Sequence, residues 1–263
     1  MNTNNVINLD FKSRKSNTPG IEIVTLDNYW SCAETPYVRE LLGEIHLLRK
    51  MGYGPDYPKH FLPFDNTDYF CIHHLFFQTV DGKRNLVGGF RQVTLESCDF
   101  YRMDIPLYEL VKKENAEQHT HVLSELISSH RKSQANLIYS SALTIKKSFR
   151  QDRDLSKTIL ELVPALTLYD MKTRNVPTVV GAAAPRFKTD ITFQKWGYTP
   201  IQYQGSTLPP FARRSIDEAN DPALVLTLTS PSEYTLECFE KHRKLVENKT
   251  VINRETIHDA IAA

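Results

Sequence analysis

The sequence lacks several features that would place it in a functional class at once. It has 263 residues, of which 32 are Lys or Arg and 31 are Asp or Glu, so its formal net charge is only +1. A general nucleic-acid binder needs an excess of cations to displace the counterions of the phosphate backbone. We therefore expect no nucleic-acid partner, although a local basic patch is compatible with the balanced total.

Long apolar runs are missing as well. No stretch approaches the roughly 18 consecutive apolar residues of a membrane-spanning helix, so we expect no integral membrane segment. Residues 1–20 are polar, lack the apolar core of a signal peptide and end in Pro19-Gly20. These features predict a flexible N-terminal tail over residues 1–20 and a cytoplasmic protein.

Motifs for metal binding and for several kinds of catalysis are also missing. The four cysteines include no Cys-x-x-Cys pair, which argues against a zinc site or a disulfide framework. His73 and His74 point to opposite faces of a predicted strand, and His119 and His121 are badly spaced on a predicted helix, so we expect no metal site. No nucleophile elbow, P-loop or dinucleotide fingerprint occurs, which disfavours serine hydrolases, phosphoryl transfer and dinucleotide binding.

The hydrophobic pattern predicts alternating strands and helices. Strands are expected at 21–26, 68–80, 85–95, 136–145, 176–184, 199–203 and 223–229. Helices are expected at 37–51, 115–131, 155–173 (kinked or shortened by Pro164) and 187–196, with a last one opened by a capping box at 230–233. This order predicts one α/β domain, of the α+β kind with a mixed sheet, over residues 21–263, including a helical extension over about 231–263.

The segment from residue 136 to residue 160 carries the strongest chemical signal. A strand that passes through a polar turn into a helix presents unpaired N–H groups and the positive end of a helix dipole. Cations crowd this turn: Lys146, Lys147, Arg150, Arg153 and Lys157. Two interpretations are open, namely a site for a pyrophosphate or phosphopantetheine arm and a solvated turn that keeps the protein soluble.

This segment resembles the acyl-CoA-binding motif of the GNAT N-acyltransferase superfamily, in which an apolar strand leads into [QR]-x-x-G-x-[GA] at a helix start. Arg150 falls on the first position of the motif, whereas Arg153 and Leu155 replace its two small residues. The tyrosine that often serves as general acid in that superfamily aligns with Phe193. The resemblance implies that an acyl-CoA or acyl-phosphopantetheine co-substrate contacts Leu143, Thr144, Ile145, Arg150, Gln151, Asp152, Arg153, Asp154, Leu155 and Ser156.

The first half of the chain is similar to the acyl-homoserine-lactone autoinducer synthases and to the long-chain N-acyl amino acid synthases. Asp65 and Arg91 fall on the F-D and G-x-x-R motifs of that branch. Its E-x-S-R-F strand corresponds to residues 139–143, where Ser141 is kept but Tyr139 and Ala142 replace the glutamate and the arginine. These replacements argue against S-adenosylmethionine as the amino donor.

The resemblance implies a GNAT-like fold and an N-acyltransferase. The acyl group would pass from a thioester, carried by coenzyme A or acyl carrier protein, to the amine of a small molecule, with an amino acid as the favoured acceptor. Tyr139 would relay a proton and Asp65 and Arg91 would orient the acceptor, Arg91 by a bidentate grip on a carboxylate, with Ser141 beside them.

Each of these roles has a structural alternative. Tyr139 fits an ordinary sheet tyrosine, Asp65 a turn cap and Arg91 its partner in a bridge. The aromatic residues of the loop at 53–64 fit either an acyl tunnel or a hydrophobic plug. For the whole protein, a non-catalytic member of the fold that binds an acyl chain or a protein and an acetyl-CoA-dependent acetyltransferase are the competing classes.

Overall fold

The computed structural model of the protein describes residues 20–54, 64–213 and 221–257. Its strands are β1 (Ile21–Asp27), β2 (Ile72–Val80), β3 (Lys83–Thr94), β4 (Leu137–Ile145), β5 (Thr178–Ala183), β6 (Thr199–Pro200), β7 (Gln202–Tyr203), β8 (Ser206–Thr207), β9 (Phe211–Ala212), β10 (Pro222–Leu228) and β11 (Thr250–Ile252). Its α-helices are α1 (Pro36–Tyr53), α2 (Leu95–Phe100), α3 (Pro106–Lys113), α4 (Glu117–Ser133), α5 (Arg153–Thr173), α6 (Thr189–Lys195) and α7 (Glu233–Glu247). Single 3₁₀ turns are η1 (Tyr29–Ser31), η2 (Asn66–Tyr69), η3 (Lys147–Phe149) and η4 (Pro185–Phe187).

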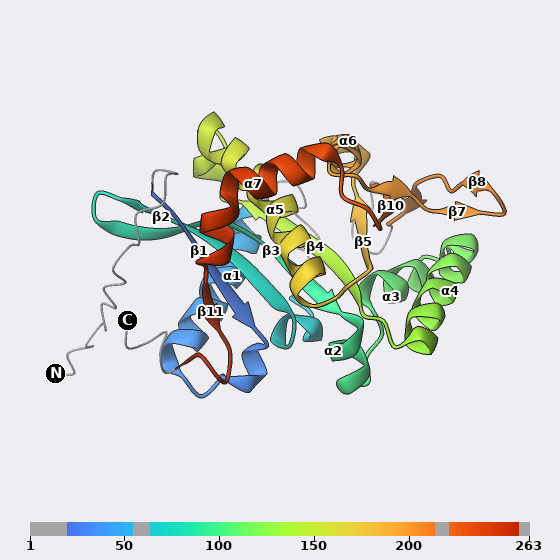
Figure 1. Cartoon of the computed structure of the whole chain (residues 1–263), viewed down its shortest axis with the longest axis horizontal. Coiled ribbons are helices and arrows are strands. Elements are labelled where there is room, and N and C mark those ends of the chain that lie inside the picture. Colours follow the sequence, from blue (N-terminus) through green and yellow to red (C-terminus); the bar gives the residue numbers. More distant parts are fainter. Residues whose placement is uncertain (1–19, 55–63, 214–220, 258–263) are drawn as a thin grey trace.

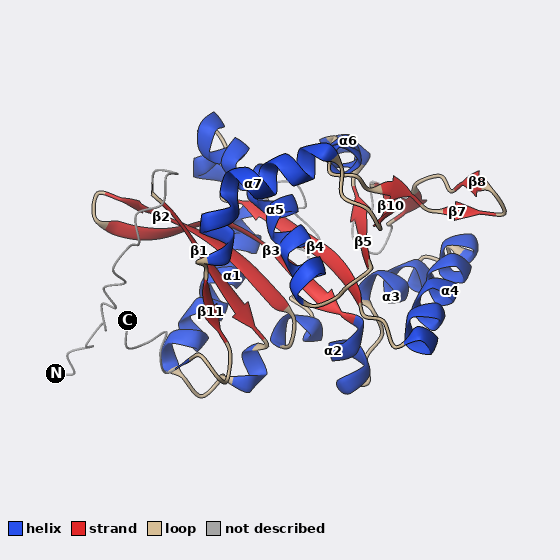
Figure 2. Cartoon of the chain, viewed as in Figure 1, coloured by secondary structure: helices blue, strands red, loops and turns tan. Residues whose placement is uncertain are grey.

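A nine-stranded mixed sheet forms the centre of the fold (Figures 1 and 2). Its order is β11-β1-β2-β3-β4-β5-β10-β6, and β9 also pairs with β10. The pairs β1–β11 and β4–β5 are parallel, whereas β1–β2, β2–β3, β3–β4 and β5–β10 are antiparallel. The expected mixed sheet flanked by helices is confirmed.

Helices cover both faces of this sheet. The helices α5 and α7 pack on each other and lie in front of the sheet in Figure 1. Side chains of β1 point alternately to the two faces of the sheet. Ile23 belongs to the core under α5 and α7, whereas Val24 and Leu26 belong to the core under α1. A third core joins α2, α3 and α4 to β4, β5 and β10.

Some predictions for individual elements are wrong. Pro164 does not shorten α5, which runs from Arg153 to Thr173 with Pro164 buried inside it. The cap of α7 is Ser232, whose hydroxyl accepts the N–H of Thr235 at 3.2 Å, so the helix begins later than a box at Ser230 implies. The segment after residue 231 is helical only to Glu247, since β11 then pairs with β1. Neither α2 nor α3 was predicted.

Two expectations fall mostly outside the described residues. These are the flexible tail at 1–20, of which only Gly20 is described, and the aromatic loop at 53–64, of which residues 55–63 are not described. Among the helices of the described ranges, none has the length and apolarity needed to cross a membrane.

Candidate functional site

The ladder between β4 and β5 ends before the strands do. They pair from Leu137–Thr178 to Ser140–Gly181. Beyond that point β4 stays paired with β3 as far as Ile145, and β5 stays paired with β10 as far as Ala183. The two strands therefore diverge in the middle of the sheet. Past Ser140, the edge of β4 that faces away from β3 has no strand paired to it.

A bulge lies in β4 at the same level. The register of the β3–β4 ladder shifts beside Arg91, and Ala142 takes a left-handed φ of 56°. An extra residue in one strand reverses the faces to which the following side chains point. Ser141 accordingly contacts Arg91, whereas Leu143 packs against the core under α5 although it follows Ser141 by two residues.

Side chains from outside the sheet bond the carbonyl groups at this end of β4. Tyr53, the last residue of α1, donates its hydroxyl to the carbonyl of Leu143 at 2.7 Å. Arg150 donates from Nε to the carbonyl of Ile145 at 2.9 Å and from Nη2 to that of Gly52 at 2.8 Å. Burial raises the pKa of Tyr53, so its hydroxyl stays protonated and remains a donor at neutral pH.

Two arginines and two aspartates, Arg49, Asp65, Asp68 and Arg91, form a charged network beside the bulge. Arg91 donates Nη1 and Nη2 to the two carboxylate oxygens of Asp65 at 3.0 and 2.7 Å, and Nε to the hydroxyl of Ser141 at 3.0 Å. The carboxylate of Asp68 lies 2.7 Å from Arg91 and 2.6 Å from Arg49. We call these four residues the arginine–aspartate network.

The turn that carries the two aspartates explains their position. Asp65 caps η2 by accepting the N–H of Thr67 at 2.9 Å, and Asp68 accepts the N–H of Asp65 at 2.9 Å, which completes a capping box. Burial alone would raise the pKa of Asp68, but Arg91 and Arg49 together hold it below its ordinary value. The carboxylate of Asp68 is therefore ionised at neutral pH.

Exposure differs sharply within the arginine–aspartate network. The side chain of Asp68 is 0% exposed, that of Arg91 8% and that of Asp65 37%. Because Arg91 already grips the carboxylate of Asp65, it can bind a substrate carboxylate in the expected bidentate way only after Asp65 leaves. The structure thus places Asp65 as a turn cap and Arg91 in a bridge, and leaves Asp65 as the member that faces outward.

Tyr139 extends the arginine–aspartate network. It lies two residues before Ser141 on β4, and hydrogen bonds join Ser141 to Arg91 and Arg91 to Asp65. Burial raises the pKa of Tyr139, although Arg91 opposes the shift, and the side chain therefore stays a neutral phenol near pH 7. The four expected catalytic residues lie together in the structure.

The expected co-substrate residues form two groups. Leu143, Thr144 and Ile145 lie on the diverging end of β4, and residues 150–156 form the turn between β4 and α5 and the first turn of that helix. Gln151, Asp152, Arg153 and Asp154 are exposed, and Leu155 is buried. The carboxylate of Asp152 accepts the N–H of Leu155 at 3.0 Å and caps α5.

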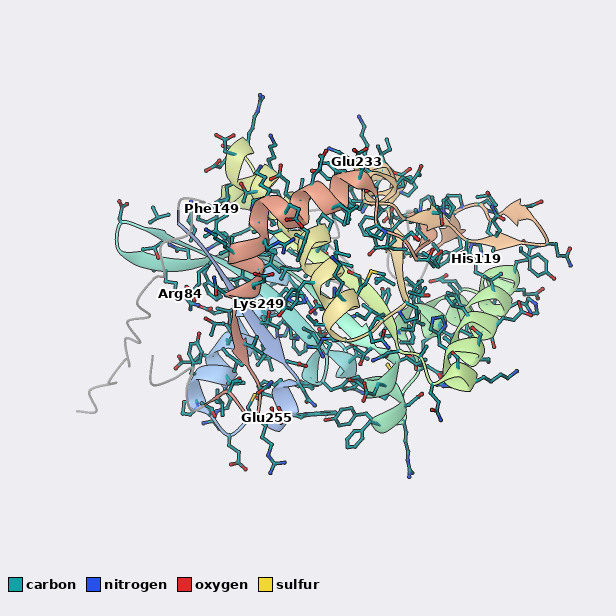
Figure 3. The ribbon with its side chains drawn as sticks, viewed as in Figure 1. Arg84, His119, Phe149, Glu233, Lys249 and Glu255 are labelled. Atoms are coloured by element: carbon teal, nitrogen blue, oxygen red, sulfur yellow. The ribbon has the colours of Figure 1, made fainter. Side chains whose placement is uncertain are left out.

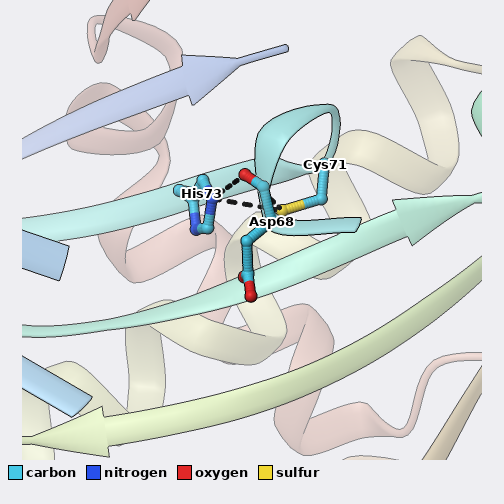
Figure 4. Close-up of side chains that lie close together, drawn as sticks. All are labelled: Asp68, Cys71 and His73. Carbon is cyan, nitrogen blue, oxygen red and sulfur yellow. Dashed lines mark hydrogen bonds between the residues drawn. The ribbon is translucent and has the colours of Figure 1, made fainter. Parts of the chain in front are cut away.

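Asp68, Cys71 and His73 lie close enough to suggest a metal site. Figure 4 shows the Asp68 carboxylate pointing away from the other two side chains, and it is His73 Nε2 that lies 2.8 Å from the Asp68 carbonyl and 3.2 Å from the Cys71 sulfur. Burial raises the pKa of Cys71 well above its ordinary value and lowers that of His73 to about 3. The Asp68 carboxylate instead binds Arg49 and Arg91, two cations that would repel a metal ion. The cluster therefore fits a buried ion-pair network better than a metal site.

Sequence reasoning missed two residues of this site, Arg49 and Asp68, and considered Tyr53 only among the aromatic residues of the loop at 53–64. Arg49 is a buried cation in α1, beside the apolar positions that face the core. A charge at the edge of an apolar helix face is a signal, since such charges are rarely buried unless paired. Asp68 had the weaker signal of following Asp65 by three residues, the spacing of a capping box.

A surface depression of about 410 Å³ lies elsewhere, between β9 and the segment before α4. It is lined by Phe211, Ala212 and residues 114–119, including His119 (Figure 3). His119 is not a free base there, because its Nε2 bonds the carbonyl of Pro209 at 3.0 Å. None of the expected site residues lines this depression.

No known family model matches the sequence, and no curated protein matches it either. Solved structures do match. The CoA-dependent acyl-homoserine lactone synthase BjaI matches with a TM-score of 0.50 at 15% identity, over 92% of this chain and 98% of BjaI. The acyl-homoserine lactone synthase LasI (TM-score 0.49, 14% identity, 83% and 93% covered) and FeeM, an N-acyl amino acid synthase from uncultured soil microbes (0.45, 13%, 81% and 92%), also match.

The match to BjaI shows that this chain has the fold of an acyl-homoserine lactone synthase, as the resemblance implied. It covers nearly the whole of both chains. At such low identity the likeness concerns the fold, while the chemistry has to be argued from the residues of this chain.

Proposed function

We propose that this protein is an N-acyltransferase that moves an acyl group from a thioester to the amine of a small molecule, with an amino acid as the favoured acceptor. The observation that carries the proposal is the divergence of β4 from β5 directly beside the arginine–aspartate network. A diverging strand edge can pair with the amide groups of a pantetheine arm. In the proposed binding mode, the arginine–aspartate network lies next to the end of that arm.

The proposed reaction needs no covalent enzyme intermediate. The amine nitrogen attacks the thioester carbonyl, the carbon–sulfur bond breaks, and the thiolate leaves while the amine loses a proton. Backbone N–H groups at the bulge of β4 are the proposed donors to the developing oxyanion, since fixed donors near a reacting carbonyl lower the barrier. The donor is acyl-CoA or an acyl carrier protein, whose acidic surface suits the cations of the β4–α5 turn.

Asp65 is the proposed contact for the acceptor. It is the outward-facing carboxylate of the arginine–aspartate network, and an ammonium group is attracted to it. Attack requires the neutral amine, so a proton has to leave. Tyr139 and Ser141 are the proposed relay, because they lie two residues apart on β4 and Ser141 receives a hydrogen bond from Arg91.

The test is an assay of thiol release with acetyl, octanoyl and palmitoyl thioesters, in the presence and absence of an amino acid mixture, with mass spectrometry of the product. We expect thiol release that depends on the amine. Asp65→Asn retains the cap of η2 but loses the charge, and Tyr139→Phe loses one hydroxyl group. Tyr139→Phe should lower kcat by about a hundredfold or more, the scale of a lost proton-transfer group. Asp65→Asn should weaken use of the amine, because the charge that attracts it is lost.

Tyr203→Phe is the matched control for Tyr139→Phe, because Tyr203 lies on the separate β7–β8 hairpin. It should leave turnover unchanged. If no thioester yields amine-dependent thiol release, the proposed transfer is wrong. Binding of an acyl thioester without turnover would favour the non-catalytic alternative.

A further inference from the structure

We propose that Asp152 makes this protein indifferent to the diphosphate of coenzyme A, so that a donor is recognised through its acyl group and pantetheine arm. This inference rests on the proposed function and specifies how its donor is selected. The site concerned is the turn between β4 and α5. A turn of this kind would ordinarily hold a phosphate group with its free N–H groups and the positive end of the helix.

Here three N–H groups of the turn bond to the turn itself. Phe149 N–H donates to the carbonyl of Lys146 at 2.9 Å, Arg150 N–H to that of Lys147 at 3.2 Å, and Asp152 N–H to that of Phe149 at 3.2 Å. These bonds form η3 and the link from it to α5. Three backbone donors that could contact a diphosphate are thus committed to local structure.

The start of α5 already holds an anion of its own. The Asp152 carboxylate accepts the N–H of Leu155 at 3.0 Å, and the Asp152 carbonyl accepts that of Ser156 at 3.0 Å. Asp154 adds a second carboxylate in the first turn. A diphosphate brought to this helix end would meet two like charges where it needs donors, which opposes binding.

Side-chain cations do not replace these donors. Arg150, which resembles the first position of a phosphate-binding motif, bonds the carbonyl groups of Ile145 and Gly52. Ser156 directs its hydroxyl to the carbonyl groups of Phe149 and Arg150, both at 3.4 Å, instead of outward. The cations that remain on the surface are long, exposed side chains, which attract anions from a distance but fix no phosphate geometry.

The residues present therefore do not fit a diphosphate, which leaves the acyl group and the pantetheine arm as the parts of a donor to be recognised. Two consequences can be measured. Coenzyme A and pantetheine should bind with similar affinity, and thioesters of the two that carry the same acyl group should be used with similar kcat/KM. Removing the charge of Asp152 should raise the affinity for coenzyme A and leave the affinity for pantetheine unchanged.

Calorimetry of the full chain with coenzyme A and with pantetheine tests the binding, and matched acyl-CoA and acyl-pantetheine pairs test turnover. For the wild-type protein we expect the two Kd values to agree within about threefold. Asp152→Asn retains a side chain that caps helices well. It should tighten coenzyme A by about three- to tenfold, the size of a charge interaction at a helix end, and leave pantetheine unchanged.

Glu233→Gln is the control. Glu233 is an exposed acid in the first turn of α7, apart from Phe149 of the β4–α5 turn in Figure 3. Its substitution should alter neither ligand. Two results would overturn the inference while the acyltransferase proposal stands. One is that coenzyme A binds the wild-type protein about thirtyfold more tightly than pantetheine does. The other is that the affinity for coenzyme A is the same in Asp152→Asn as in the wild-type protein. If neither ligand binds and no thioester is used, the proposed function fails and the inference falls with it.

Discussion

Substituting Asp68 by Asn should destabilise the protein more than the loss of any exposed ion pair. Asp68 is fully buried and its carboxylate lies within 2.7 Å of both Arg49 and Arg91. The variant keeps the shape of the side chain but removes the carboxylate that Arg49 and Arg91, 6% and 8% exposed, share. Asp65 remains bonded to Arg91. Removing one partner of a buried ion pair costs about 3–5 kcal/mol, because the remaining charge is left without compensation.

The measurement is urea-induced unfolding followed by tryptophan fluorescence, with a thermal scan beside it. At about 2–4 °C per kcal/mol for a chain of this size class, the expected loss lowers Tm by roughly 6–20 °C. Asp99→Asn is the control, because it breaks the Asp99–Arg131 bridge of 2.6 Å whose side chains are 42% and 45% exposed. Such a pair contributes about 0–1 kcal/mol. Equal losses in the two variants would refute the reasoning.

The pH dependence of Asp68 gives a second check on the same variant. The folded protein holds the pKa of Asp68 below its ordinary value of 3.8, so the carboxylate stabilises the fold at neutral pH. That stabilisation is lost as the pH falls below the ordinary value and through the folded one. The difference in unfolding free energy between the wild-type protein and Asp68→Asn should therefore be constant near neutrality and shrink below about pH 4.

Two further predictions concern neighbouring groups. Gly52→Ala should lower the free energy of unfolding, measured in urea, by about 1–3 kcal/mol, because its Cβ would lie 2.2 Å from the Thr144 methyl group. Gly43→Ala in the same helix is the control: its Cβ would meet nothing within 4 Å, so it should be neutral or stabilising. His73 has a pKa of about 3 against an ordinary 6.5, so unfolding takes up a proton between these values and stability falls as the pH falls. Its NMR signals should not titrate above about pH 5, and the stability of His73→Gln should depend less on pH in this window, whereas a midpoint near 6.5 would contradict burial as the cause.

Elements set by residues close together in the sequence could be predicted from it. The turn at Asp81-Gly82 has φ values of 51° and 74°, the double left-handed conformation that such a pair favours, and the hairpin was therefore predictable. The helix α3 has eight residues, too few for its period to stand out, although Pro106 sits at its first turn. The strand β11 has three residues and pairs with β1, more than two hundred positions away in the chain, so no local signal could reveal it.

The site was predictable only in part, for a related reason. The order of Asp65, Arg91 and Ser141 along the chain could be recognised, and the structure brings these three side chains together. The pairing of Arg91 with Asp65 was among the alternatives drawn from the sequence. Its contact with Asp68, and the contact of Asp68 with Arg49, could not be deduced, because these residues come from a turn and a helix that meet only in the folded chain. An arginine expected to bind a substrate carboxylate is thus bonded to carboxylates of the protein.

The bulge in β4 is the feature on which both groups of expected site residues depend. Simple alternation would place Ser141, Leu143 and Ile145 on one face of the sheet. The left-handed Ala142 breaks that rule, so Ser141 contacts Arg91 while Leu143 and Ile145 pack against the core under α5. Because alanine rarely takes this conformation and carries no signal for it, the change of face had no counterpart in the sequence. It allows one short stretch of strand to direct a polar group to the arginine–aspartate network and apolar groups to the opposite core.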